Sequence, residues 1–205
     1  MRLDLDGLHI APLSADDVQA FVTYRRIPEV ARFQSWSPDY TLADGQRLVE
    51  AQALREFPEK GEWMQFGIHT GGHLAGDLAI HSLADQPDTY EFGVTIDPAH
   101  QGSGVATLAL IATLAHLFDA HHAHRVYAEC DERNDSVKRL FARLGLRHEG
   151  TAREADWFKE EWTTVETWAL LATDRPRRDR PSSRDGFEAL AAAAAGPADF
   201  LSGAQ

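Results

Sequence analysis

The chain has 205 residues, of which 43% are hydrophobic and 25% charged, as is typical of an ordinary globular protein with one domain. Its formal net charge of -12 makes it a poor sequence-independent binder of nucleic acid or anionic membranes and suits cationic partners. The single cysteine excludes an internal disulfide and a cysteine-based zinc cluster. No apolar run approaches the roughly 18 residues of a membrane span, and the first residues do not form a secretory signal. We therefore expect a soluble, cytoplasmic protein that binds neither nucleic acid nor membrane.

The composition changes after Asp174 and divides the chain into two parts. Residues 175–205 hold five arginines, three prolines and a run of five alanines, but few large apolar side chains. Such a segment cannot bury enough surface to offset the entropy lost on ordering. We expect a single domain over residues 1–174, followed by a tail that is flexible or forms a short docking helix.

The first half of the domain predicts a strand, two helices and three further strands. Ser14 to Asp17 has the pattern of a capping box, which predicts the start of the first helix. Apolar residues at four-residue spacing predict the second helix. Thr70-Gly71-Gly72 predicts the turn of an antiparallel hairpin. The strands are expected at residues 8–12, 63–68, 73–80 and 90–96, and the second helix at residues 42–57.

The second half of the domain alternates helices with strands. A helix over residues 104–120 is apolar on nearly all sides, so we expect it to be buried on more than one face. A helix over residues 135–144 has apolar residues at ideal spacing and ends at Gly145, a favourable C-terminal cap. Strands are expected at residues 125–130, 146–153 and 163–171. This order of elements indicates a mixed α/β single domain.

The most informative stretch runs from Val94 to Ala106, where a strand leads through two glycines into the long helix. Glycines allow a ligand close to the backbone, and the free amides at a helix N-terminus bind phosphate. A Walker-type phosphate loop is excluded because no Lys-Ser or Lys-Thr follows the glycines. A dinucleotide fingerprint needs a third glycine, where residue 107 is threonine, and a parallel strand pair in place of the predicted hairpin. The third candidate ligand is the pyrophosphate of coenzyme A.

Gln101, Gly104 and Ala106 match the cofactor loop Gln/Arg-x-x-Gly-x-Gly/Ala of the GNAT superfamily of N-acetyltransferases, which residues 8–173 resemble. The features that support the match are Glu91-Phe92-Gly93, Pro98, Asn134-Asp135-Ser136-Val137, Leu144-Gly145-Leu146 and Glu149-Gly150. Their order is similar to the RimJ/RimL-like branch, which modifies the N-termini of ribosomal proteins. The resemblance implies a mixed, mostly antiparallel sheet with a V-shaped splay between its central strands and helices on both faces.

The resemblance also implies acetyl-CoA as the cosubstrate and no metal. Loop amides would hold the pyrophosphate, and the backbone of the preceding strand would pair with the pantetheine arm and hold the thioester carbonyl. Asn134 would hydrogen-bond the same arm, and Arg139 is a candidate for the phosphates. The residues expected to bind the coenzyme are Val94, Thr95, Ile96, Gln101, Gly102, Ser103, Gly104, Val105, Ala106, Asn134 and Arg139.

Acetyl transfer needs a group that takes a proton from the amine and one that assists the departing thiolate. Many relatives place a tyrosine as the acid four residues before the helix-ending glycine, and this chain has Phe141 there. We therefore expect Ser136 to assist the sulfur, with capping of local amides as the alternative. Glu91 is the candidate base, because it lies on the strand face opposite Tyr90 and Phe92. Its alternatives are a structural carboxylate or a group that binds the acceptor amine.

Three aromatic residues lie in loops that flank the acceptor groove of the resembled fold. Phe33, Trp36 and Trp157 are therefore candidates for acceptor binding, with loop packing as the alternative. The leading function is direct N-acetylation of a primary amine, either the α-amine of a protein N-terminus or a small amine such as an antibiotic or polyamine. A non-catalytic module that binds acyl-CoA is the alternative class of function. A homodimer is the candidate oligomeric state.

Overall fold

The computed structural model describes residues 1–5 and 7–175, so the predicted tail lies outside the described residues except for Arg175. Eight strands form one sheet in the order β1-β2-β3-β4-β5-β6-β8-β7. Neighbouring strands are antiparallel except β5 and β6, which are parallel. The strands are β1 (Leu3–Leu5), β2 (Leu8–Pro12), β3 (Trp63–Thr70), β4 (His73–Ser82), β5 (Thr89–Ile96), β6 (Arg125–Asp131), β7 (Arg147–Phe158) and β8 (Glu161–Leu171). The helices are α1 (Val18–Arg25), α2 (Pro28–Ala31), α3 (Leu42–Gln52), α4 (Val105–Asp119) and α5 (Asp135–Arg143).

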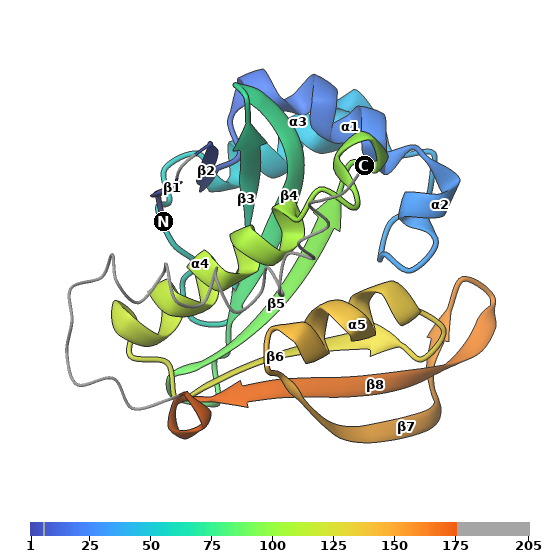
Figure 1. The fold of residues 1–205 in the computed structure, drawn as a ribbon. Helices are drawn as coiled ribbons and strands as arrows, with labels where there is room; N and C mark the ends of the chain where they lie inside the picture. Colours follow the sequence, from blue (N-terminus) through green and yellow to red (C-terminus); the bar gives the residue numbers. More distant parts are fainter. Residues whose placement is uncertain (6, 176–205) are drawn as a thin grey trace, which may run out of the picture.

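Helices cover both faces of the sheet. Figure 1 shows α4 crossing in front of β5 and α5 lying over β6 and β8, with α1 and α3 together at the β3–β4 end. Helix α1 contacts Asp77 of β4 through Tyr24 at 2.6 Å, whereas Phe141 of α5 packs against Phe92 of β5. Phe92 pairs with Ile80, three residues from Asp77, so these contacts lie on opposite faces. We call them the α1 face and the α5 face.

The main core lies between α4, α5 and the sheet. Helix α4 is buried along most of its length, as its nearly all-round apolar sequence predicts. Helix α5 reaches the same core with Phe141 and ends at Gly145, whose φ of 82° is the left-handed cap predicted from the sequence. A second, smaller cluster joins Phe21 and Val22 of α1 to Val49 of α3.

The second predicted helix is shorter than expected, because α3 ends at Gln52 rather than at Phe57. Pro58 disfavours helical backbone at the residue before it. Phe57 instead turns inward and stacks on the His121 ring, with 3.6 Å between ring centroids. Gln52 fixes the end of α3 to β3, since its side-chain amide bonds both backbone groups of Gln65.

Two short elements and a longer hairpin differ from the sequence prediction. Strand β1 precedes a turn at Gly7, and α2 begins at Pro28, whose missing N–H is tolerated in the first turn of a helix. The β7–β8 hairpin extends to a turn at Lys159 and Glu160, both with positive φ. Strand β7 is exposed along nearly its whole length, so it lacks the apolar alternation that predicts a strand. Within residues 1–5 and 7–175, no helix has the length and apolar character needed to cross a bilayer.

Candidate active site

The loop between β5 and α4 is held in shape by its own side chains. A short 3-10 turn, Pro98–His100, follows β5. The Gln101 side-chain amide donates to the Ile96 carbonyl at 3.0 Å, and the Ser103 hydroxyl donates to the His100 carbonyl at 2.5 Å. The side chains of Gln101 and Ser103 thus fix the loop, and their predicted contribution to coenzyme binding falls to their backbones.

The same loop presents an open surface rich in backbone amides. Gly102 and Gly104 have φ of 75° and 86°, and a Cβ added to either would meet open space. The amides of residues 102–107 have no hydrogen-bond partner in the part of the chain that the structure describes, and the first α4 bond runs from Leu108 N to Gly104 O at 3.0 Å. Free amides at the N-terminus of a helix bind phosphate oxygens. The loop therefore fits the pyrophosphate of coenzyme A.

Strands β5 and β6 pair only near their N-terminal ends. Their parallel register ends at the pair Glu91–Tyr127, and beyond it the two ribbons diverge (Figure 1). The rest of β5 pairs with β4, so the edge over Val94, Thr95 and Ile96 has no strand partner on its other side within the described residues. This is the V-shaped splay that the resemblance implies. A free strand edge can hydrogen-bond an extended pantetheine arm as it would an added strand.

The first turn of α5 carries two of the predicted residues. Asn134 caps the helix, because its Oδ1 accepts a hydrogen bond from Val137 N at 3.3 Å. The side-chain Nδ2 of Asn134 has no hydrogen-bond partner among the described residues, which suits its predicted bond to pantetheine. Ser136 is exposed, and its hydroxyl lies 3.5 Å from the guanidinium of Arg139, a third predicted residue, which lies one turn further along α5.

Helix α5 also contacts the start of α4 through a residue that the sequence analysis missed. Arg143 donates to Thr107 Oγ1 at 3.3 Å, in the first turn of α4. The sequence feature that could have pointed to Arg143 is its spacing from Arg139, because residues four apart lie on the same face of a helix. Phe141, at the position where relatives carry tyrosine, is buried and packs edge-on against Phe92 at 5.6 Å. Its ring belongs to the core.

Four side chains form one row across the α1 face. Trp63, His81, Glu91 and Tyr127 are successive cross-strand partners on β3, β4, β5 and β6, so they share this face. The Trp63 and His81 rings stack with centroids 4.8 Å apart. His81 Nδ1 lies 3.4 Å from Glu91 Oε2, and the Tyr127 hydroxyl donates to the same oxygen at 3.1 Å. Glu91 is thus held from both neighbouring strands at the point where the splay begins.

Electrostatics distinguish the polar groups beside Glu91. Burial first, and then the Glu91 carboxylate, raise the pKa of the Tyr127 hydroxyl to about 12, so it keeps its proton at neutral pH. Glu129 lies two residues further along β6 and accepts a hydrogen bond from the Thr167 hydroxyl at 3.4 Å. Burial, followed by repulsion from Glu91, raises the pKa of the Glu129 carboxyl.

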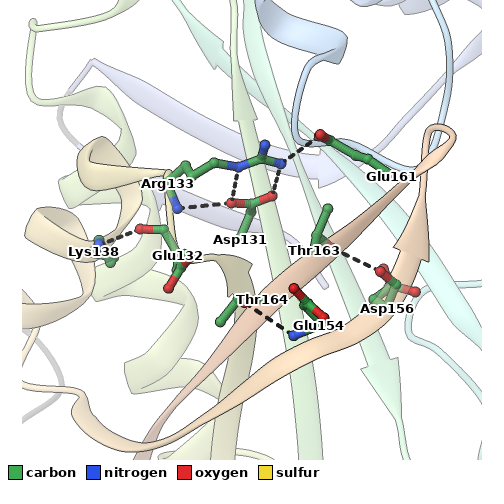
Figure 2. A network of polar contacts seen from close by, with 9 residues as sticks. All are labelled: Asp131, Glu132, Arg133, Lys138, Glu154, Asp156, Glu161, Thr163 and Thr164. Carbon is green, nitrogen blue, oxygen red and sulfur yellow. Dashed lines mark hydrogen bonds and ion pairs between the residues drawn. The ribbon is translucent and has the colours of Figure 1, made fainter.

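Asp131, the next residue of β6 on the α1 face, is in the opposite electrostatic situation. Figure 2 shows Arg133 donating to both Asp131 carboxylate oxygens and to Glu161. The donor–acceptor distances are 2.8 and 2.6 Å to Asp131 and 2.8 Å to Glu161. The Arg133 guanidinium lowers the pKa of the Asp131 carboxyl. Asp131 and Glu161 therefore share one cation, which offsets one of their two negative charges.

Three carboxylates near the splay lack such a cation. Asp156 pairs across the hairpin with Thr163, on the face shared with Glu129, and its charge contributes to the raised pKa of Glu129. Glu91, Glu129 and Asp156 form no ion pair with a lysine or arginine among residues 1–5 and 7–175. We call these three residues the acidic group. Their uncompensated charge suits a cationic ligand.

Two of the predicted acceptor-binding aromatics lie in the segment after α2. The Trp36 ring stacks on the Arg25 guanidinium at 3.6 Å, and its Nε1 donates to the Arg25 carbonyl at 3.1 Å. Phe33 is half-buried beside Arg32. Lys159, at the tip of the β7–β8 hairpin, donates to the carbonyl of Trp36 at 2.9 Å and also to that of Ala31. This contact holds the segment against the hairpin. No local sequence pattern indicates it, because Trp36 and Ala31 lie 123 and 128 residues from Lys159 in the chain.

The third predicted aromatic lies elsewhere. Trp157 is 59% exposed and packs edge-on against Trp162, its cross-strand partner, with centroids 5.3 Å apart. The register places this pair on the hairpin face opposite to Asp156 and Thr163. The structure therefore does not bring Phe33, Trp36 and Trp157 together, and their part in acceptor binding stays a prediction.

Neither the free cysteine nor a metal cluster offers competing chemistry among the described residues. Burial raises the pKa of the Cys130 thiol to about 12, which leaves little thiolate at neutral pH. The described residues include no group of three or more His, Cys, Asp or Glu side chains arranged to hold a metal ion. The amide-rich loop and the polar row at the splay therefore form the candidate active site.

Comparisons with known proteins agree with this geometry. The family model described as an acetyltransferase (GNAT) domain matches residues 8–147. The probable N-acetyltransferase YjcK of Bacillus subtilis is 30% identical over 141 residues, which are 66% of this chain and 76% of that protein. A ribosomal-protein-serine acetyltransferase of Escherichia coli is 24% identical over 128 residues, which are 62% of this chain and 70% of that protein. The fold is similar to that of a spermidine N-acetyltransferase from Vibrio cholerae, solved with CoA and spermine, with a TM-score of 0.72 and 17% identity over 83% of this chain and 98% of that one.

The splayed sheet and the amide-rich loop fit an enzyme that takes an acyl group from coenzyme A. The chain belongs to the GNAT family of acetyltransferases, because the family model covers more than half of it. It is an acetyl-CoA-dependent N-acetyltransferase, so the predicted cosubstrate and reaction class are confirmed.

Proposed function

We propose that the enzyme transfers the acetyl group directly to a primary amine of a cationic acceptor, and that Glu91 takes up the proton of that amine. The observation that carries this proposal is the position of Glu91 at the last β5–β6 pair, beside the free edge predicted to hold pantetheine. Its side chain is 22% exposed, so an acceptor or a bridging water can reach the carboxylate. A positioned carboxylate within reach of the amine can serve as general base.

The proposed reaction assigns each proton to a stated group. Acetyl-CoA supplies an activated thioester. Glu91 takes one proton from the acceptor ammonium, directly or through a water molecule. The amine nitrogen then forms the N–C bond as the C–S bond breaks, and its second proton leaves with the sulfur as a thiol. We propose that Ser136 hydrogen-bonds the departing sulfur, because it lies exposed in the first turn of α5 and Phe141 has no polar atom to offer.

The α-amine of a protein N-terminus is the first candidate acceptor. Its support is the similarity of the motif order to the RimJ/RimL-like branch and to the ribosomal-protein-serine acetyltransferase. The second candidate is a small polyamine. It is favoured by the acidic group, whose members beyond Glu91 suit an acceptor with a further positive charge.

A thiol-release assay with the Glu91→Gln variant tests the base. The variant should bind acetyl-CoA like the wild type but turn over about 100-fold more slowly, a typical general-base contribution. The loss should shrink as pH rises, because more of the acceptor amine is already neutral. Glu50→Gln, which neutralises an exposed carboxylate on α3, is the matched control and should retain full turnover.

The same assay separates the acceptors. A peptide with a free α-amine, the same peptide blocked at its N-terminus, and spermidine are compared at equal concentration. Turnover of the free peptide alone supports the first candidate, and turnover of spermidine alone supports the second. Glu91→Gln with wild-type turnover, or a wild-type protein that releases no CoA with any amine, contradicts the proposal.

A further inference from the structure

The carboxyl group of Glu91 must lose its new proton before the next cycle. Each turnover converts one ammonium group into a neutral amide and a thiol, so one proton has to reach solvent. Within the described residues the Glu91 carboxylate contacts two titratable side chains, His81 and Tyr127. Water can take this proton directly, because the Glu91 side chain is 22% exposed, and a neighbouring side chain adds a second route only if it can accept the proton.

Tyr127 cannot accept this proton. Its hydroxyl already donates to Glu91 Oε2, and with a pKa raised to about 12 it stays protonated at neutral pH. A protonated phenol can hold and orient the carboxylate, but it cannot accept a second proton from it. His81 differs, because a neutral imidazole has one ring nitrogen that accepts a proton and one that donates.

His81 lies between Glu91 and Trp63 in the row, and its side chain is 22% exposed, as is that of Glu91. Its Nδ1 lies 3.4 Å from Glu91 Oε2, somewhat longer than the roughly 2.7–3.2 Å of a strong bond, as is common for catalytic pairs before substrate binds. The Trp63 ring lies nearly parallel to the imidazole, at 16°, and so fixes the plane of that ring. Trp63 is 44% exposed and stands at the outer end of the row.

We infer that His81 is the proton outlet of the enzyme: it takes from Glu91 the proton that Glu91 has taken from the acceptor amine, and releases it to water. This inference rests on the proposed function of Glu91. Nδ1 receives the proton from Oε2, which restores the carboxylate, and the imidazolium then loses a proton to solvent, which restores the neutral ring. His81 does not touch the reacting atoms, so it is a positioning residue that acts through Glu91.

Chemical rescue tests the inference, because an added base can replace a missing proton acceptor but not a missing structural contact. His81→Gln should lower kcat about tenfold in dilute buffer and leave the affinity for acetyl-CoA unchanged. Free imidazole added at constant pH and ionic strength should return kcat toward the wild-type value, while the wild type should not respond. His81→Phe keeps an aromatic ring against Trp63 and should give the same loss and the same rescue in a protein with wild-type thermal stability.

Two further variants make the outcome unambiguous. His73→Gln changes an exposed histidine at the other end of β4 and should retain wild-type kcat with no response to imidazole. Glu91→Gln should have a low kcat that imidazole does not restore, because the variant has no carboxyl group from which imidazole could take a proton. Wild-type kcat in the folded His81 variants, or a loss of kcat that imidazole does not relieve, would contradict the role of His81 as proton outlet. The proposed role of Glu91 as base would be unaffected by either result. Wild-type turnover in Glu91→Gln would instead overturn the proposed function itself.

Discussion

The predicted coenzyme loop and the row on the α1 face differ in the groups that they present to a ligand. The loop presents backbone amides, whereas the row presents side chains. The loop is contiguous in sequence and presents backbone amides, which need only glycine at Gly102 and Gly104 and the start of a helix. The row is made of side chains from four strands, and its geometry depends on the register that brings them together. The loop is therefore sensitive to backbone geometry, whereas the α1 face is sensitive to the chemistry of single side chains.

The largest effect should come from changing the backbone of the loop. Gly104→Val places a β-branched residue at φ 86°, where L residues are strained, and puts side-chain atoms in the open space above the amides. We expect the Kd for acetyl-CoA to rise about 100-fold, equivalent to roughly 2.7 kcal/mol. Calorimetric titration measures this change, with thermal unfolding as the check that the variant is folded. An unchanged Kd in a folded variant would show that the loop does not hold the pyrophosphate.

A smaller effect should follow from neutralising a member of the acidic group. Glu129→Gln should raise KM about tenfold for an acceptor with two positive charges and leave the KM of a singly charged amine unchanged. Burial and repulsion from Glu91 raise the pKa of Glu129, so its ionisation opposes folding as pH rises through that raised value. The variant should therefore gain stability relative to wild type at neutral pH more than at about pH 4. Equal changes in KM for both acceptors would show that Glu129 does not bind the second positive charge of the acceptor.

A carboxylate outside both regions gives the contrasting case. Asp17 Oδ1 lies 2.7 Å from His69 Nε2, and this hydrogen bond raises the pKa of the His69 ring. A raised histidine pKa contributes stability that is complete below its unfolded value and is lost as pH rises through the folded value. Asp17→Asn should lower the free energy of unfolding by about 1 kcal/mol at about pH 5.5 and by less at about pH 8.5. Urea titration at the two pH values measures the difference, and an equal loss at both would mean that the pair is not ionic.

The smallest effect should come from a side chain on the coenzyme side. Arg143→Met keeps much of the length of the side chain but removes its bond to Thr107 beside the loop. Because backbone amides carry most of the predicted binding, the Kd for acetyl-CoA should rise only about threefold. A loss as large as that of Gly104→Val would mean that side chains, rather than amides, hold the phosphates.

These differences also explain what the sequence could predict. The loop was found because Gln101, Gly104 and Ala106 are neighbours in the chain. Glu91 could be proposed as a base from the alternation of one strand, which needs no knowledge of the neighbouring strands, and this role stays a prediction. His81 and Tyr127 were missed because cross-strand register is a long-range property that no local pattern contains. Lys159 was missed for the same reason.

Errors in the predicted elements have local causes. The end of α3 was misplaced because apolar spacing continued to Phe57, although Pro58 breaks the helix and Phe57 packs against His121. The extent of β7 was underestimated because an exposed strand has no apolar alternation. The predicted roles of Ser136 and of the three aromatics depend on where substrates lie, so they stay predictions.

The short parallel register that ends at Glu91–Tyr127 also has a consequence for cooperativity. It is the seam between two half-sheets, β1–β5 and β6–β8, which separate beyond it. A ligand that lies along the free edge of β5 and reaches Asn134 on α5 adds hydrogen bonds on both sides of this seam. Local opening of one half-sheet then requires release of the ligand, so backbone amides of β8, far from the coenzyme, should exchange their hydrogens more slowly when it is bound. Slower exchange in β8 would show that the bound coenzyme couples the two half-sheets across the seam.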